Sequence, residues 1–380
     1  MKLYFCGYNG FKQFENCDEL MLADVTAWTS VNLPKPQKCA TSLKFCSSWS
    51  VNVIGISKSL LLTGCLKGAP GQSKILTFAN EIKAISCNDL FCLILLDDGR
   101  CYKFLFDSAE LSELKFIGVG EEDGSADKKS TTCVIEHITC GQTFSVAVTN
   151  TNVVYNIPSR IHEFPKHVKV KKVICGAEHA LLLTSNGDVF SWGSSSRGQL
   201  GLGELNNEQA PTLIDALAGV KITDISAGLW HSAAVSAFGD LYVWGWNLNG
   251  QLGKPIYKNV KVNFENGRTD VVRHKDVSVF ASPEVVDLPA QSIDNEENEC
   301  LETQFDVEQV HCGGRHTIIQ TKCGKVLGCG FNRFGQLGLS EKHNDDGNVV
   351  RFYEIGHSIT DVFQVKCGSW CTIFFAECHQ

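Results

Sequence analysis

The chain has 380 residues and a net charge of −8, with 43% hydrophobic and 20% charged residues, proportions that are ordinary for a folded globular protein. No apolar stretch reaches 18 residues, and the longest, around Leu90–Leu96, has the length of a strand, which excludes a membrane-spanning helix. No signal peptide is visible and the 18 cysteines show no zinc-ligand spacing, so we expect reduced thiols in the cytosol or nucleus.

In chain order, the first segment is residues 1–14, MKLYFCGYNGFKQF. It is a degenerate copy of a segment, Trp-Gly-x-Asn-x-x-Gly-Gln-Leu, that ends the well-formed repeats further along the chain. We therefore predict one strand at the N-terminus that belongs to a repeat unit whose other strands lie elsewhere.

A second pattern, an apolar run followed by a small or polar residue, recurs through the rest of the chain. We use that residue as the anchor of each repeat, and the seven anchors are Ser47, Asn88, Gly141, Gly176, Gly228, Gly313 and Gly368. The first three copies are degenerate, whereas those from Val173, Ile225 and Val310 share one frame almost position by position. Self-similarity at a period near 50 residues indicates a repeat architecture.

The clearest copy reads as a strand, a tight turn and a second strand. Leu181–Leu183 and Val189–Trp192 flank Asn186-Gly187-Asp188, and Asn-Gly between apolar runs predicts a hairpin with a type I′ turn. Runs of four to six apolar residues without a period of 3.6 favour buried strands over helices. Several short strands per unit, repeated radially, are typical of the blades of a β-propeller.

The spacing between Gly228 and Gly313, 85 residues, predicts an insertion of roughly 30 residues within 254–309. Residues 254–278 carry a charge of +3 and residues 279–309 a charge of −9. An acidic, proline-containing stretch with few aromatic residues predicts an irregular loop. Two interpretations stay open for it: it keeps the protein soluble, or it binds a basic partner.

The end of the chain is one strand short of a full unit. Only 12 residues follow Gly368, and the strand predicted within residues 1–14 would complete that last blade. A ring closed in this way leaves no open sheet edge. We therefore predict a single all-β domain over residues 1–380, a seven-bladed propeller closed between its N- and C-terminal strands, with an acidic insertion at 254–309.

These repeats, above all CGAEHALLL, FSWGSSSRGQLG and YVWGWNLNGQLG, resemble those of the regulator of chromosome condensation (RCC) family, whose members are seven-bladed propellers. The resemblance is specific over residues 173–253 and 310–339 and degenerate over 45–150. More narrowly, with the N-terminal FCGYNG, the phrasing is similar to the family member that partners a JmjC-domain dioxygenase acting on histone lysines.

Three histidines invite a catalytic or metal-binding interpretation. His179, His231 and His316 each lie three residues after an anchor. Because they are related by the rotation of the ring, they are too far apart to share one ion, and we favour buried histidines hydrogen-bonded within their own blades. With no P-loop, GxSxG or HExxH motif, we expect no catalytic, cofactor or metal site, and no enzyme.

The position two residues after each anchor varies while the rest of the repeat is fixed. In ring order it holds Trp49, Leu90, Thr143, Glu178, Trp230, Arg315 and Trp370. We expect these side chains to emerge on one face near the central axis. Tryptophan and arginine are enriched at interface hot spots, which favours a partner-binding face. Its residues would be Trp49, Glu178, Trp230, Arg315 and Trp370. The alternative is that the large rings plug the channel mouth and pack on neighbouring blades.

The function expected from these features is that of a non-enzymatic, monomeric interaction scaffold. The resemblance implies a JmjC-domain histone demethylase or hydroxylase as partner, which itself would hold any iron or 2-oxoglutarate. It also implies a place in the nucleus, with cytoplasm and chromosome as further locations, and an influence on histone methylation and chromosome organisation. The alternative is a guanine-nucleotide exchange factor for a Ran-like or other small GTPase, with the acidic insertion as its active element.

No direct nucleic-acid or membrane partner is expected. The most basic run, Lys166–Lys172, alternates lysine with valine and is interpreted as the solvated face of a strand. Family members that hold nucleosomes often use a basic N-terminal tail, which this sequence does not show. We therefore expect any contact with chromatin to be indirect.

Overall fold

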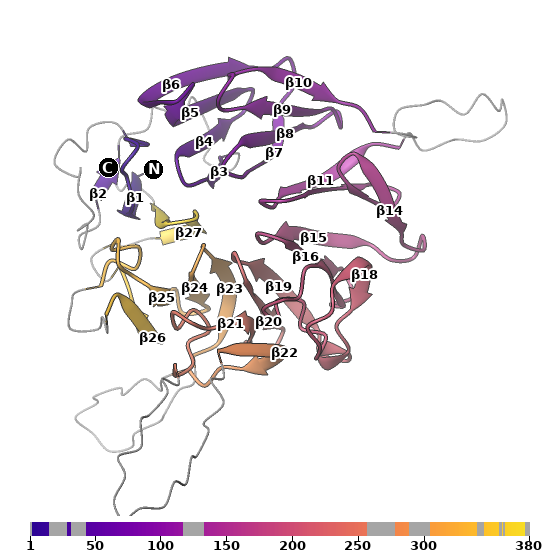
Figure 1. Ribbon diagram of the computed structural model, residues 1–380, viewed down its shortest axis with the longest axis vertical. Coiled ribbons are helices and arrows are strands. Elements are labelled where there is room, and N and C mark those ends of the chain that lie inside the picture. The colour runs from indigo at the N-terminus through magenta and orange to yellow at the C-terminus, as the bar shows by residue number, and fades with distance from the viewer. Residues whose placement is uncertain are drawn as a thin grey trace, which may run out of the picture.

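The computed structural model describes residues 2–14, 29–31, 43–116, 133–256, 278–288, 305–339, 346–356, 359 and 362–376. Its strands form seven four-stranded antiparallel sheets arranged around a central axis (Figure 1). The predicted all-β, seven-bladed propeller is therefore confirmed. No helix among the described residues is long and apolar enough to cross a lipid bilayer.

Six blades are built from consecutive strands, each running from the axis outward. The first is β3 (Lys44–Ser47), β4 (Val51–Ile56), β5 (Ser59–Leu66) and β6 (Ala69–Thr77). The second is β7 (Ile82–Cys87), β8 (Phe91–Leu96), β9 (Cys101–Leu105) and β10 (Leu111–Leu114). The third is β11 (Ile135–Cys140), β12 (Ser145–Thr149), β13 (Val153–Asn156) and β14 (Ser159–Glu163).

The next three blades contain the strongest repeats. The fourth is β15 (Val170–Cys175), β16 (His179–Thr184), β17 (Val189–Gly193) and β18 (Glu208–Leu213), followed by a 3-10 turn, Asp215–Leu217. The fifth is β19 (Ile222–Ala227), β20 (His231–Ser236), β21 (Leu241–Trp246) and β22 (Val279–Val285). The sixth is β23 (Val307–Cys312), β24 (His316–Thr321), β25 (Val326–Phe331) and β26 (Asn348–Glu354).

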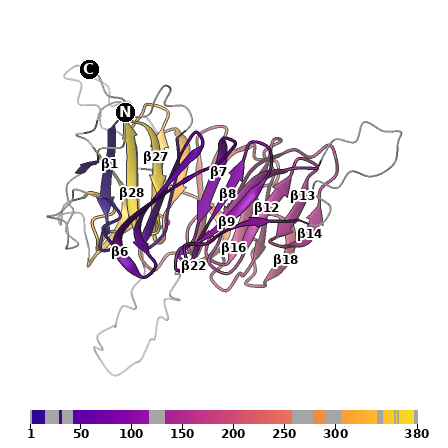
Figure 2. The ribbon, with the colours of Figure 1, turned by 90° about the horizontal axis from the view of Figure 1, so that it is seen from above.

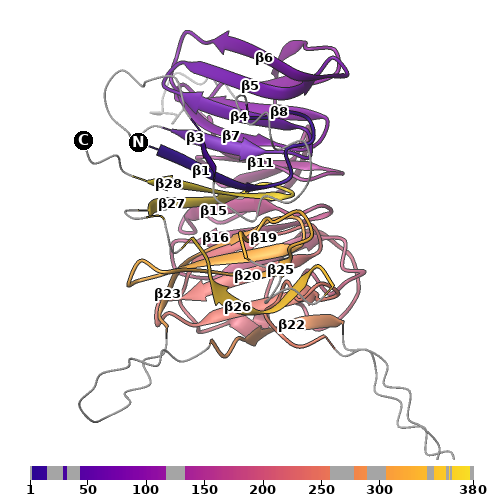
Figure 3. The same ribbon diagram turned by 90° about the vertical axis from the view of Figure 1, so that its left-hand side faces the viewer.

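The seventh blade joins the two ends of the chain, as predicted. It contains β27 (Val362–Cys367), β28 (Cys371–Ala376), β1 (Lys2–Gly7) and β2 (Thr29–Val31). β1 runs antiparallel to β28 over six residue pairs, from Lys2 opposite Ala376 to Gly7 opposite Cys371. Figures 2 and 3 show β1, β28 and β27 side by side, with the N-terminal strand outside the C-terminal pair.

The hairpin predicted around Asn186-Gly187 is present, but its turn is not type I′. β16 ends at Thr184 and β17 begins at Val189, and of the loop between them only Gly187 has positive φ, at +101°. The loop between the strands is longer than the two residues of a type I′ hairpin. It is closed by a hydrogen bond from the Asp188 N–H to the Thr184 hydroxyl, at 3.1 Å.

The apolar core lies between the blades. Each cluster of buried residues in the described chain draws its members from two neighbouring sheets. The cluster at the closure joins Phe5 of β1 and Phe375 of β28 to Ile54 of β4. Closing the ring therefore completes the core between the seventh and first blades as well as a hydrogen-bonded sheet.

Of the predicted insertion at 254–309, the structure describes residues 254–256, 278–288 and 305–309. β22 lies in this range and forms the outer strand of the fifth blade, so the range is not a loop throughout. The stretch after β22 begins and ends beside the β20–β21 turn: the Val286 N–H donates to the Leu241 carbonyl and the Val307 N–H to the Gly239 carbonyl. The rest of the predicted acidic loop lies outside the described residues.

We expect deletion of residues 1–14 to unfold the ring. The deletion removes β1, leaves β28 with an unpaired edge and takes Phe5 and Phe14 from the closing cluster. Thermal unfolding followed by circular dichroism should show the melting temperature lowered by well over 10 °C or no cooperative transition. Deletion of residues 377–380, which follow β28, is the control. An unchanged melting curve after the N-terminal deletion would refute the closure.

Candidate interaction face

The turns that follow the innermost strands form one end of the channel. In each turn the anchor N–H donates to the carbonyl three residues on, as from Gly228 to His231 at 2.9 Å. In the first blade this bond runs from Ser48 to Val51, so the anchor predicted at Ser47 is wrong by one residue. The reason is that β3 extends through Ser47, which pairs with Asn52. The true positions two after the anchors therefore begin with Ser50, and Trp49 lies one after its anchor.

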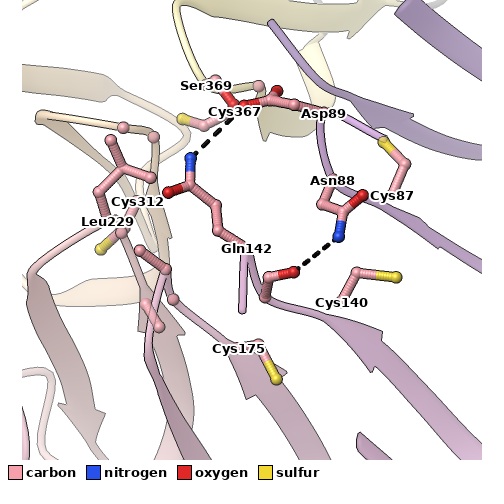
Figure 4. Close-up of a pocket in the computed structure, with 18 of the residues that line it drawn as sticks. Cys87, Asn88, Asp89, Cys140, Gln142, Cys175, Leu229, Cys312, Cys367 and Ser369 are labelled. Carbon is pink, nitrogen blue, oxygen red and sulfur yellow. Dashed lines mark hydrogen bonds between the residues drawn. The ribbon is translucent and has the colours of Figure 1, made fainter. Parts of the chain in front are cut away.

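We define the anchor face as the end of the ring made by these turns and by the loops after the third strand of each blade. The mouth of the channel on this face is a cavity of about 130 Å³ (Figure 4). It is lined by Ser47, by the anchors of the other six blades and by residues next to them, such as Gln142 and Asp89, and by none of the described tryptophans. The large rings therefore do not line this cavity, whereas they do pack on neighbouring blades, as Trp49 does on Trp370.

The cysteines that precede the anchors also line this cavity. They are Cys87, Cys140, Cys175, Cys312 and Cys367. Burial raises the pKa of the Cys175 and Cys312 thiols to about 12. Such thiols stay protonated and unreactive at neutral pH, and these cysteines serve as small packing residues. No group of three or more His, Cys, Asp or Glu side chains in the described part of the chain could hold a metal ion.

The three repeat histidines are buried, but the prediction that each bonds within its own blade is wrong. Each Nε2 reaches the neighbouring blade, as from His179 to the Ser232 hydroxyl at 2.9 Å and from His231 to the Thr317 hydroxyl at 2.9 Å. His316 makes the equivalent bond to Thr372 at 3.2 Å. The sequence could not show this, because the hydroxyl acceptors belong to the next repeat.

A backbone carbonyl fixes the direction of these bonds. The Ser232 hydroxyl donates to the carbonyl of Gln199 at 2.9 Å, so its oxygen accepts from His179, whose Nε2 carries the proton. Thr317 and the carbonyl of Gln251 repeat the arrangement at 2.6 Å. His179 and His231 are thus neutral links that tie one blade, and the loop after its third strand, to the next.

The loops on the anchor face are held by their own repeat residues. In the sixth blade, Asn332 Oδ1 accepts from the Leu337 N–H and Gln336 Oε1 from the Phe334 N–H. In the seventh, Asn9 and Gln13 make the same bonds to Phe14 and Phe11. Because side-chain acceptors occupy the backbone donors, each loop presents its variable residues from a fixed frame.

These loops and turns assemble a continuous band of aromatic side chains, which we call the aromatic arc. Its members, in ring order, are Trp246, Trp230, Arg315, Phe331, Phe334, Trp370, Tyr8 and Trp49. The Tyr8 ring stacks on Trp49 with centroids 5.0 Å apart, and Trp49 meets Trp370 edge-on at 5.4 Å. Trp230 meets Trp246 at 5.6 Å.

The arc unites four of the five residues predicted for a partner-binding face. Trp49, Trp230, Arg315 and Trp370 belong to it, whereas Glu178 lies in the turn of the fourth blade, which contributes no member. Sequence reasoning missed Tyr8, Trp246 and Phe331, although each follows a glycine at or next to the end of a third strand. The variation at that loop position was the signal that could have found them.

Arg315 lies where the two halves of the arc meet. Its guanidinium carbon is 5.6 Å from the Trp230 ring centroid, 5.4 Å from that of Trp246 and 5.9 Å from that of Trp370. Arg197, from the loop after β17, approaches Trp246 at 5.1 Å. Burial lowers the pKa of Arg315, although a guanidinium stays charged at any physiological pH.

The fold and this repeated architecture define the chain as a seven-bladed β-propeller built from similar repeats. Two models of the regulator of chromosome condensation (RCC1) repeat match it, one over residues 186–235 and the other over 170–199 and 222–251. These residues form most of the fourth and fifth blades.

Among characterised relatives, the chain is similar to human RCC1 domain-containing protein 1, with 34% identity over 231 residues. The alignment covers 55% of this chain and 57% of the human protein, so the chain matches little more than half of that relative's length. The crystal structure of human WBSCR16 matches 100% of both chains with a TM-score of 0.71 at 15% identity. That of Prp20p from Saccharomyces cerevisiae matches 98% of this chain and 90% of its own, with a TM-score of 0.70 at 14% identity; both show likeness of fold.

We expect the histidine links to make the fold sensitive to acid. Burial lowers the pKa of His179 and His231 to about 3 and that of His316 to about 4, while a histidine in the unfolded chain titrates near ~6.5. Below that pH the unfolded state binds more protons, so stability is full above it and falls as the pH drops. Between about pH 6.5 and 5 each link should cost about 2 kcal/mol of unfolding free energy.

Urea unfolding at several pH values measures this effect. His231→Gln keeps an N–H donor for Thr317 but cannot titrate, so the variant should lose stability at pH 7.5 and show a shallower fall toward pH 5. His162→Gln is the control, because that ring contacts Phe164 on an outer strand. A pH slope equal to that of the unchanged chain would contradict the assignment.

Proposed function

We propose that this chain is a non-enzymatic scaffold that binds a partner protein through the aromatic arc of its anchor face. The single observation that carries the proposal is the arc itself, a continuous half-buried band of tryptophan, phenylalanine, tyrosine and arginine on one face. These are the residue types enriched at the centres of protein interfaces.

The arrangement of the arc favours recognition over a purely structural role. Its members come from four different blades, and their rings lie outside the buried clusters between blades. The loops that carry them are held by separate Asn and Gln side chains. A rigid, preorganised surface loses little conformational entropy when a partner binds.

We further propose that the partner is a JmjC-domain dioxygenase, a histone demethylase or hydroxylase, and that the complex influences histone methylation and chromosome organisation. The resemblance of the repeats to the RCC family member with such a partner supports this, as does the similarity to RCC1 domain-containing protein 1. The proposal includes a nuclear location, with cytoplasm and chromosome as further locations, and indirect contact with chromatin.

A guanine-nucleotide exchange factor for a Ran-like or other small GTPase is the second candidate function. The observation that favours it is the whole-ring likeness to Prp20p, the structure of which was described with binding to Gsp1p and histones. The acidic stretch proposed as the active element begins and ends beside the β20–β21 turn, at the end of the ring opposite the anchor face. An exchange factor would thus use a different surface from the scaffold.

Affinity capture from nuclear extract with the intact chain, read by mass spectrometry, separates these functions. We expect one JmjC-domain protein in near-equal amount, and at least about tenfold less of it with the Trp230→Ala, Trp370→Ala double variant, because hot-spot tryptophans each contribute ~2 kcal/mol or more. A small GTPase recovered only after nucleotide is stripped would establish the exchange factor instead.

The control is Leu90→Ala. Leu90 holds the equivalent turn position in the second blade, is 60% exposed and lies outside the arc, so its removal should leave capture unchanged. Melting temperatures within a few degrees of the unchanged chain show that the variants fold. Equal capture by the tryptophan variant and the unchanged chain would contradict the role of the arc.

A further inference from the structure

Two arginines lie against the centre of the arc. Arg197 comes from the fourth blade and Arg315 from the sixth, and both approach the ring of Trp246 in the fifth blade between them. Within the part of the chain that the structure describes, neither guanidinium takes part in a salt bridge. The carboxylate nearest the far end of the arc, Asp89, already accepts hydrogen bonds from the Trp49 N–H and from Gln142.

Arg315 is left short of polar partners. Its Nε has almost no solvent-accessible surface and no hydrogen-bond partner among the described residues, and three tryptophan rings surround its guanidinium. Cation–π contacts offset part of the lost hydration, but a buried donor without an acceptor remains unfavourable. An incoming carboxylate would bind the partly exposed guanidinium of Arg315 beside the tryptophan rings, and a hydrogen bond between two charged groups is strong.

We propose that the arc binds a short acidic peptide segment of the partner, with one carboxylate on Arg315 and an adjacent apolar side chain on the tryptophan and phenylalanine rings. This inference rests on the proposed function and specifies the chemistry of the bound segment. Arg197, which also approaches the Trp246 ring, is a second positive group that can pair with a carboxylate. The recognised sequence therefore has acidic residues flanking an apolar one.

The structure favours this occupant over others. A nucleic acid would need a row of cations along its phosphates, whereas the centre of the arc offers two arginines among many rings. A second copy of the arc would bring arginine against arginine and no carboxylate. The chain's own acidic stretch after β22 begins and ends beside Gly239, at the opposite end of the ring.

Fluorescence anisotropy with synthetic peptides tests the proposal on the full chain. The probes are fluorescein-labelled Gly-Ser-Glu-Phe-Glu-Ser-Gly and its counterparts with Gln or Lys in place of Glu, or Ala in place of Phe. We expect the Glu-Phe-Glu peptide to bind at least tenfold more tightly than each of the other three. Its affinity should fall as salt rises, because charge pairing contributes to binding.

Substitutions at Arg315 then identify the contact. Arg315→Ala should weaken binding of the Glu-Phe-Glu peptide at least tenfold, and Arg315→Lys by less, because lysine keeps the charge but cannot form a bidentate pair. Arg315→Glu should reverse the preference, so that this variant binds the Lys-Phe-Lys peptide more tightly than the Glu-Phe-Glu peptide. Arg100→Ala, at a hairpin turn and paired only with Asp98 as a salt bridge, should leave all affinities unchanged.

Several outcomes would overturn the inference. Equal binding of the Glu and Gln peptides would do so, as would unchanged binding by Arg315→Ala or failure of Arg315→Glu to reverse the preference. Sedimentation that shows a dimer broken by Arg315→Ala would assign the arc to a second copy of the chain. If Arg315→Ala unfolds, the comparison of Arg315→Lys with the unchanged chain across the salt series decides.

Failure of this inference is distinguishable from failure of the proposed function. If the tryptophan variant loses capture from nuclear extract but the peptide affinities do not depend on peptide charge or on Arg315, the proposed scaffold function is retained and the acidic-segment inference is rejected. Peptide binding that depends on Arg315 without any capture through the arc would retain the peptide site and reject the proposed function.

Discussion

The apolar core of this protein lies between its blades, and this packing determines where the turns and loops of each blade are placed. A four-stranded sheet has two apolar faces here, and each must be covered by a neighbour. The buried cluster of the closure, with Phe5 and Phe375 on one side and Ile54 on the other, completes the last of these contacts. No blade can be stable alone, so the positions of the turns and loops on one face are set by the ring as a whole.

The histidine links extend the same constraint to the anchor face. Each joins a blade to the next through a hydroxyl, and for His179 and His231 that hydroxyl also bonds the carbonyl of a repeat glutamine, as Ser232 bonds both His179 and Gln199. The glutamine side chain in turn holds its own loop, since Gln199 Oε1 accepts from the Arg197 N–H. The loop that presents Arg197 to Trp246 is therefore fixed by the bonds that join the fourth and fifth blades.

The sequence was sufficient to predict the class of fold, the number of blades and the closure, because these follow from patterns repeated within the chain. It misplaced the first anchor, because Ser47 and Ser48 are both small residues after an apolar run and only the pairing of Ser47 with Asn52 distinguishes them. It assigned the histidines to their own blades, because a bond such as His231 to Thr317 spans 86 positions of sequence. Contacts between repeats leave no mark in the pattern of one repeat.

The candidate face was half predictable for a related reason. Variation within a fixed frame pointed to Trp230, Arg315 and Trp370, but it could not show that Tyr8 at the start of the chain stacks on Trp49. That contact depends on the closure, which brings the seventh blade against the first. The arc is thus a product of the ring rather than of any one repeat.

The degenerate N-terminal copy shows how stability and display are separated in this fold. FCGYNGFKQF keeps Asn9 and Gln13, whose side chains accept the same backbone bonds as Asn332 and Gln336 in the regular sixth blade. It departs from the regular pattern in the residues between them, where Phe11 lies edge-on to Tyr8 at 6.1 Å. A repeat can therefore keep the Asn and Gln side chains that hold its loop, change the residues exposed by that loop, and still form a stable blade. The divergence of the N-terminal copy lies on the anchor face, and this is why the arc can run through the weakest repeats without loss of the fold.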